Sequence, residues 1–109
     1  MSFILTEEQE ELLALVRKFS EKEILPYAHQ MDVEAHFVPG LIQKIADLGF
    51  MGINVPEEYG GVGADEVTKA LVIMEFAKYD ASVAELLAVH TLSSDIILKH
   101  GTPEQKEKY

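Results

Sequence analysis

The sequence contains no cysteine, and its basic residues are few: nine lysines and arginines stand against nineteen aspartates and glutamates. The absence of cysteine excludes disulfides, iron–sulfur clusters, thiolate zinc sites and cysteine nucleophiles. The net charge of −10 argues against nucleic acid and against an anionic membrane surface, because both are bound largely through lysine and arginine. We therefore expect a cytoplasmic protein with neither of these partners.

Unbroken apolar runs are also short, and none approaches the roughly 20 residues that a membrane-spanning helix needs. The N-terminal residues are acidic where a signal peptide has basic residues. The four histidines lack the glutamate three positions earlier that a di-iron helix bundle requires, so we expect no metal site. The glycine cluster at 60–63 has neither the lysine nor the spacing of a phosphate-binding loop.

What the sequence does have is helical periodicity in a hydrophobic composition. Hydrophobic residues make up 48% and charged residues 26% of the chain, a balance typical of a folded globular domain. Apolar residues recur at three- and four-residue steps, which predicts an all-α fold, a small up-and-down bundle of four to five helices. The expected helices cover residues 6–24 (with a further turn at 27–32), 39–48, 65–79, 80–100 and 102–109.

Local signals predict the ends of these helices. Thr6 and Gln9 can form a capping box at the start of the first helix, and Asp65 can cap the third. Pro39 suits the first position of the second helix, and Gly49 suits its left-handed end.

The residues between the second and third helices change in composition. Five of the seven glycines lie within 49–63, which predicts a loop with one short extended piece at 51–55. The helix that follows carries an apolar stripe along one side, formed by Val67, Ala70, Leu71, Met74 and Ala77.

The segment 80–100 is apolar on nearly all sides. It carries no formal charge between Glu85 and Asp95, and its aliphatic residues spread around most of the helix. Such a helix is normally surrounded by other elements, and one small bundle covers only part of it. We therefore expect the stretch from Val83 to Leu98 to meet further protein or an apolar ligand.

Several residues of this segment leave alternatives open. His90 is either a core histidine bonded to a backbone carbonyl or a hydrogen-bond partner of a ligand or a neighbouring loop. Glu85 is a cap paired with Ser82, a solvated residue, or a polar group at the mouth of a cavity. Ala84 and Ala88 either permit close helix packing or leave room for a ligand.

Five stretches resemble one protein family in order and spacing. Residues 48–61 read LGFMGINVPEEYGG and resemble the LGxxGxxxPxEYGG segment of acyl-CoA dehydrogenases. Residues 5–9 (LTEEQ), 23–26 (EILP), 80–82 (DAS) and 99–106 (KHGTPEQK) match the same family. The sequence is therefore similar to the N-terminal helical domain of an acyl-CoA dehydrogenase over essentially its whole length.

This resemblance implies a longer flavoenzyme, in which residues 1–109 form the N-terminal domain, cut within its last helix, and a middle β-barrel and a C-terminal helical domain follow. The enzyme is expected to be an FAD-dependent oxidoreductase of fatty acid metabolism. It would be a homotetramer that dehydrogenates acyl-CoA thioesters between Cα and Cβ and passes electrons to electron-transferring flavoprotein. In the family the catalytic base and the FAD-binding segments lie in the other domains. We therefore expect this chain to hold no catalytic or cofactor-binding residue and to be inactive alone.

In relatives the helix equivalent to 82–99 flanks the fatty acyl chain. The resemblance assigns Ala84, Glu85, Ala88 and Leu92 to the substrate-facing wall, with plain helix contacts of the two alanines as the alternative. Glu85 is more polar than a long-chain tunnel favours, which indicates a short or polar acyl group. Since coenzyme A is polyanionic, we expect its phosphates to bind away from this acidic domain.

Two other functions stay open from the sequence. One is a stand-alone helical module that binds a partner helix through the segment 80–100. The other is a superfamily relative with changed chemistry, such as an acyl-CoA oxidase, a flavin monooxygenase or a desulfinase.

Overall fold

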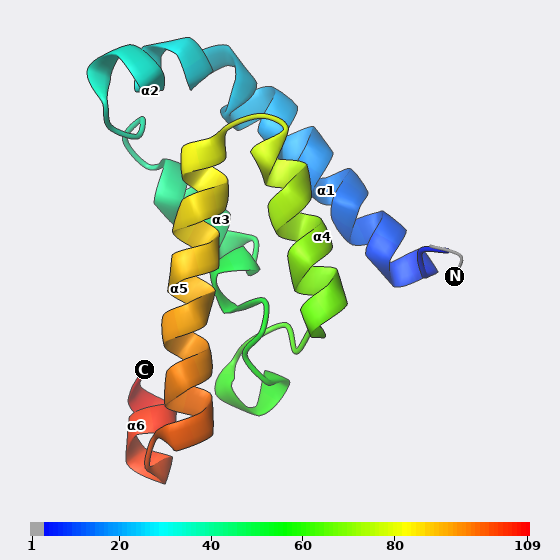
Figure 1. The fold of residues 1–109 in the computed structure, drawn as a ribbon, viewed down its shortest axis with the longest axis vertical. Coiled ribbons are helices and arrows are strands. Elements are labelled where there is room, and N and C mark those ends of the chain that lie inside the picture. Colours follow the sequence, from blue (N-terminus) through cyan, green and yellow to red (C-terminus); the bar gives the residue numbers. More distant parts are fainter. Residues whose placement is uncertain (1–3) are drawn as a thin grey trace.

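The computed structural model describes residues 4–109, and all regular structure in this range is helical (Figure 1). This confirms the expected all-α fold, and the turn expected at 27–32 is a full helix, α2. The elements in chain order are α1 (Glu7–Glu23), η1 (Leu25–Tyr27), α2 (Ala28–Glu34), α3 (Leu41–Asp47), η2 (Phe50–Gly52), η3 (Glu57–Tyr59), α4 (Glu66–Ala77), α5 (Ala81–His100) and α6 (Pro103–Lys108), where η denotes a 3₁₀ helix.

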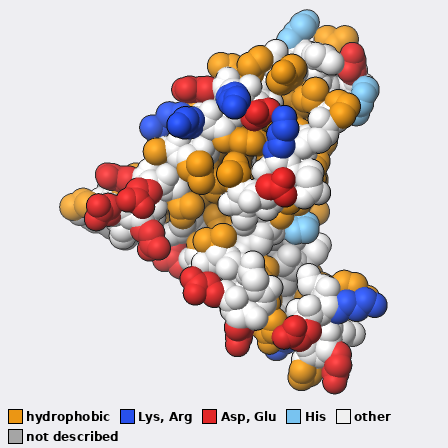
Figure 2. Space-filling view, turned by 180° about the vertical axis from the view of Figure 1, so that it is seen from behind, with side chains coloured by type: hydrophobic (Ala, Val, Ile, Leu, Met, Phe, Trp, Pro, Cys, Tyr) orange, Lys and Arg blue, Asp and Glu red, His pale blue; other side chains and the backbone are white. Residues whose placement is uncertain are grey.

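Helices α4 and α5 lie side by side and run antiparallel, and α1 packs against α4 (Figure 1). The 3₁₀ turn η2 packs against α5, and α6 folds back on the last turns of α5. The domain is flat, with principal extents of 42 × 36 × 21 Å. Hydrophobic side chains remain visible near the centre of its back face (Figure 2).

Three aromatic rings mark the centre of the core. Phe76 of α4 meets Phe50 of η2 edge-on at a centroid distance of 5.4 Å, and Phe19 of α1 at 6.4 Å. Edge-to-face pairs add about 0.5–1.5 kcal/mol to the hydrophobic stabilisation of the rings. The aliphatic residues buried with them include Val16, Ile24, Ile45, Val72, Val83 and Leu87. The core therefore joins α1, α3, α4, α5 and η2.

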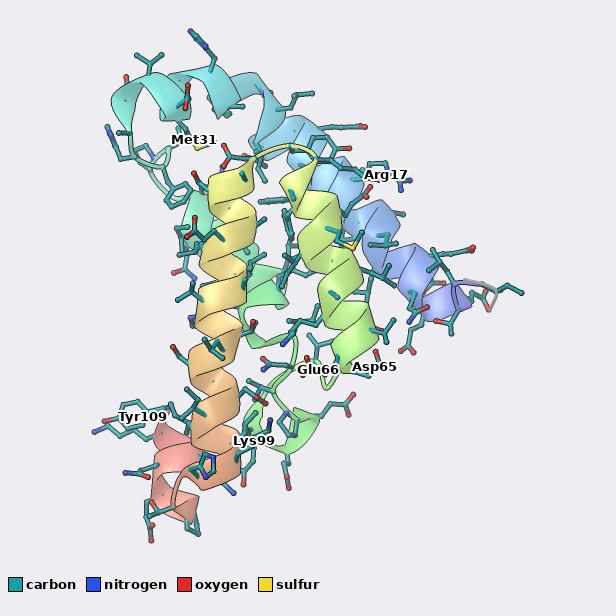
Figure 3. All side chains as sticks on the ribbon, in the orientation of Figure 1. Arg17, Met31, Asp65, Glu66, Lys99 and Tyr109 are labelled. Carbon is teal, nitrogen blue, oxygen red and sulfur yellow. The ribbon has the colours of Figure 1, made fainter. Side chains whose placement is uncertain are left out.

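The helix caps follow local sequence signals. Thr6 and Gln9 form the expected capping box, in which the Gln9 backbone N–H donates to Thr6 Oγ1 at 3.1 Å. Asp65 caps α4 by accepting the Thr68 backbone N–H at 2.8 Å (Figure 3). Gly49 has the expected left-handed conformation, with φ of +91°.

The expected role of Pro39 as the first helical residue is wrong, because α3 begins at Leu41. Pro39 and Gly40 instead form the middle of a turn, in which the Leu41 N–H donates to the Val38 carbonyl at 3.2 Å. Gly40 has φ of +83°, which matches the glycine position of a type II turn after proline.

The extended piece expected at 51–55 is also wrong, because residues 50–52 form η2 and the chain then folds back on itself. Three backbone N–H groups on the return path donate to the outgoing path: Val62 to Gly52, Gly63 to Val55 and Ala64 to Ile53, at 3.0, 2.8 and 2.8 Å. These bonds satisfy backbone groups of the loop without a partner strand. Gly61 lies where the two paths cross, and a Cβ at this position would overlap the Val55 carbonyl.

The buried side of α4 differs from its apolar stripe. Val67, Ala70, Met74 and Ala77 are exposed, whereas the polar residues Thr68 and Glu75 are buried beside Val72 and Phe76. The reason lies in α1, which supplies polar partners. The side-chain amide of Gln9 donates to Thr68 Oγ1 at 3.0 Å, and Arg17 Nε donates to Glu75 Oε1 at 2.9 Å (Figure 3).

Glu75 generates a prediction about pH and stability. Glu75 is 4% exposed, and its carboxylate pairs with Lys78 at 2.7 Å and with Arg17. Hydrogen bonds from Lys78 and Arg17 hold the pKa of Glu75 below its ordinary value of 4.5. Because folding lowers this pKa, the stabilisation is complete above pH 4.5 and is lost as the pH falls through the folded-state pKa.

We expect Glu75→Gln to lower the free energy of unfolding at pH 7 by about 1–3 kcal/mol, because two cations lose their charged acceptor. The difference from the parent protein should shrink as the pH falls from 7 to 3, measured by chemical denaturation. Glu21→Gln on the exposed side of α1 is the control. Equal pH dependence of both variants would contradict the role given to Glu75.

The close approach at Gly61 can be tested by substitution. Gly61→Ala should destabilise the protein by about 2–3 kcal/mol, because its Cβ overlaps backbone at the crossing of the loop. Gly60→Ala is the matched control, since Gly60 has φ of +87° but open space around it, and it should cost about 1 kcal/mol. Thermal unfolding measures the stability of both variants. Equal losses of stability would show that the close approach at Gly61 is not important for the loop conformation.

Candidate functional site

The candidate site is built on α5, whose start is fixed by Asp80. The Asp80 carboxylate accepts the backbone N–H groups of Ser82 at 2.8 Å and Val83 at 3.1 Å. Asp80 therefore takes the cap position, and the capping box considered for Ser82 and Glu85 does not form. Glu85 consequently stands exposed on the second turn.

One side of α5 is in the core and the opposite side is bare. Val83, Ala84, Leu87 and Thr91 are buried against α4 and η2. The opposite side carries Val89, Leu92 and Ile96, which are 57%, 58% and 54% exposed, together with Glu85 and Ala88. We call these five residues the bare flank. Their recurrence at three- and four-residue steps places them on one face of the helix.

The four predicted wall residues divide between the two sides of α5. Glu85, Ala88 and Leu92 lie on the bare flank, whereas Ala84 is 6% exposed and packs in the core. Sequence reasoning missed Val89 and Ile96, although their spacing from Leu92 was the signal that could have found them. The substrate contacts of all four predicted residues stay a prediction.

Of the two alternatives for His90, the core histidine is wrong, because His90 is exposed. It lies between the buried side and the bare flank, and its backbone carbonyl accepts the Ser94 hydroxyl at 3.2 Å.

The charges around the bare flank are few and mostly paired. Glu85 is its single charged residue, and Lys99 is the one lysine or arginine of α5 (Figure 3). Lys99 pairs with Asp95 at 3.0 Å, and this hydrogen bond raises the pKa of Lys99. The flank is therefore an apolar surface with one carboxylate at its N-terminal end, suited to hydrocarbon rather than to an anion.

Although its unbroken apolar runs are short, α5 is long and apolar enough to cross a membrane by length and composition alone. Serine, threonine and histidine interrupt its apolar runs without adding charge, so the helix passes the test by length and composition. A mostly buried core helix of a soluble protein passes the same test, whereas 22% of the apolar stretch of α5 is buried within residues 4–109.

A separate hollow of about 430 Å³ lies between α2 and the start of α5. Asp32, His36 and Asp80 are among its lining residues. Within residues 4–109, no three histidine, aspartate or glutamate side chains are placed to hold a metal ion.

Within residues 4–109, neither the glycine turn at 60–63 nor most of the basic side chains fit the diphosphate of FAD. Such a group calls for basic side chains or free backbone N–H groups. The glycine turn at 60–63 is closed by its own chain, because the Cβ position of Gly61 is filled by Val55. Five of the nine basic residues are in ion pairs with carboxylates of the same chain: Arg17, Lys44, Lys69, Lys78 and Lys99.

Comparison with known proteins adds independent findings. The family described as "Acyl-CoA dehydrogenase, N-terminal domain" matches residues 6–109. An acryloyl-CoA reductase (NADH) of Anaerotignum propionicum is 40% identical over 100% of this chain, and an acyl-CoA dehydrogenase of Bacillus subtilis is 45% identical over 95% of it. Each alignment covers 28% of the relative.

Among solved structures, butyryl-CoA dehydrogenase from Megasphaera elsdenii superposes with a TM-score of 0.89 and 36% sequence identity. The superposition covers 100% of this chain and 30% of that protein, so the chain spans less than a third of the length of the relatives it matches. The matched range and the helical fold show that this chain belongs to the acyl-CoA dehydrogenase family and corresponds to its N-terminal domain.

Proposed function

We propose that the protein containing this chain is an FAD-dependent acyl-CoA dehydrogenase, in which α5 forms one wall of the acyl pocket. The observation that carries the proposal is the bare flank of α5 in a chain of this family. Three aliphatic side chains more than half exposed on one helix are surface that a hydrocarbon ligand can cover.

The wall is proposed to bind through apolar contact. Burial of hydrocarbon is worth about 0.8 kcal/mol for each CH₂ group removed from water. Leu92 and Val89 offer such surface, and the small side chain of Ala88 leaves room beside them. Ala84 is left out of the proposed contacts because it is buried in the core.

The acyl group is proposed to be short or polar. Glu85 stands on the bare flank one turn from Ala88, and a carboxylate beside a long hydrocarbon chain would lose hydration without gaining a partner. A short chain leaves Glu85 in water, and a polar acyl group could donate to it.

The proposed reaction removes one hydrogen each from Cα and Cβ of an acyl-CoA thioester. FAD, held by other parts of the protein, would supply the two-electron oxidising power when bound. The base that takes the Cα proton also lies outside this chain. The share of residues 4–109 is to bind the acyl tail, to orient it and to keep water away from it.

The proposed partners follow from this reaction. The coenzyme A phosphates are proposed to bind outside this acidic domain. Two electrons leave at every turnover, and electron-transferring flavoprotein is the acceptor that the family resemblance implies, in a homotetrameric enzyme. One relative is named for NADH and for the reverse direction, so the acceptor has to be tested separately. The cytoplasmic location stays a prediction.

The test of the proposed function uses the full-length protein. Anaerobic addition of acyl-CoA thioesters should bleach the absorbance of oxidised flavin and yield the 2-enoyl-CoA, and electron-transferring flavoprotein should restore the absorbance. Hydrogen peroxide formed in air would indicate an oxidase, and consumption of NADH with an enoyl-CoA would indicate a reductase. Absence of flavin reduction by any acyl-CoA would overturn the proposal.

The wall itself generates a further prediction. Ala88→Leu in the full-length enzyme should lower kcat/KM for the longest good substrate by about 10-fold, because the added side chain takes the space of roughly two to three methylenes. Shorter acyl-CoAs should be little affected. Ala70→Leu is the matched control, since Ala70 is an exposed alanine on α4. An unchanged dependence of kcat/KM on acyl-chain length in the Ala88 variant would contradict the proposal that α5 lines the acyl pocket.

A further inference from the structure

In the middle of α5, the Thr91 side chain hydrogen-bonds to the backbone of its own helix. This residue is 1% exposed, and its hydroxyl donates to the carbonyls of Leu87 at 2.9 Å and Ala88 at 3.1 Å. Ser93 and Ser94 bond back in the same way to Val89 and His90. Such bonds compete with the helical ladder and bend helices. An outside contact on the part of α5 that carries Ala88 and Leu92 would therefore help to hold its shape.

The support available is the folded loop between η2 and α4. Its two paths are joined by the three backbone bonds of residues 62–64 and by the Gly61 N–H to the Pro56 carbonyl at 3.1 Å. Ile53 anchors it in the core with 2% exposure. The next residue, Asn54, is consequently carried on a backbone-bonded platform that packs against α5 through η2.

Asn54 makes the direct link between this platform and α5. Its Nδ2 donates to the Thr91 carbonyl at 3.0 Å, across 37 residues of sequence. Its Oδ1 is buried and finds no donor within residues 4–109. An unpaired buried acceptor is destabilising, so the side chain is a poor choice for stability alone. The one hydrogen bond of the Asn54 side chain goes to the backbone of Thr91. The hydroxyl of Thr91 in turn donates to the Ala88 carbonyl.

We propose that Asn54 is a positioning residue for acyl-chain selection, which acts by clamping the Thr91 turn of α5 and thereby fixing Ala88 and Leu92. This inference rests on the proposed function. Without the clamp, the back-bonded middle of α5 can shift, and the wall loses its fixed distance from the acyl chain. The clamp touches neither the substrate nor the reacting atoms.

The experiment compares Asn54→Asp and Asn54→Ala with the parent in the full-length enzyme. Asp keeps the shape but turns the donor into an acceptor that faces a carbonyl, and Ala removes the group without adding charge. Hydrogen exchange of the amides of residues 91–96 should accelerate about 3-fold or more, the effect of losing one hydrogen bond. Chain-length selectivity, measured as the ratio of kcat/KM between two acyl-CoAs that differ by two carbons, should fall by about 5-fold toward unity. The change should come from KM rather than from kcat.

Gln43→Ala is the matched control, because Gln43 also donates an amide bond, to Asp47 at 2.8 Å, but on α3. It should change neither readout. Faster hydrogen exchange with unchanged chain-length selectivity in both Asn54 variants would show that Asn54 is merely structural and would overturn the inference. Unchanged hydrogen exchange in both variants would overturn it as well. A parent enzyme inactive toward every acyl-CoA would overturn the proposed function and this inference together, whereas an active parent with unaltered variants overturns the inference alone.

Discussion

The packing of Phe76 between Phe19 and Phe50 is the contact on which the arrangement of this domain depends. These three rings join α1, α4 and η2. The core that they form can bury only one side of α5. Val83 and Leu87 enter the core beside the rings, so the residues half a turn away must face outward. The bare flank is thus a consequence of how a flat domain packs one long apolar helix.

Helix positions and caps could be predicted from the sequence because their causes are local. The Thr6 capping box, the Asp65 cap and the left-handed Gly49 each depend on residues within one turn. The buried face of α4 could not be predicted in the same way. Its polar residues Thr68 and Glu75 are buried because α1 brings matching side chains, and these come from 59 and 58 residues away.

The same distinction applies to the candidate site. Resemblance to a family pointed to α5, and three of its four predicted residues lie on the bare flank. Ala84 could not be placed from the sequence, since an alanine fits a helix contact as well as a pocket wall. Asn54 gave no sequence signal at all, because its meaning depends on a carbonyl in a distant helix that only the fold brings near.

The exposed apolar residues of α4 and α5 also affect how the association of this domain depends on temperature. Val67 and Met74 on α4 are 61% and 64% exposed, and the large aliphatic residues of the bare flank of α5 are also more than half exposed. Attraction between apolar surfaces strengthens on warming from low temperature. In residues 4–109 on their own, these exposed apolar residues would therefore attract one another more strongly in warm than in cold solution.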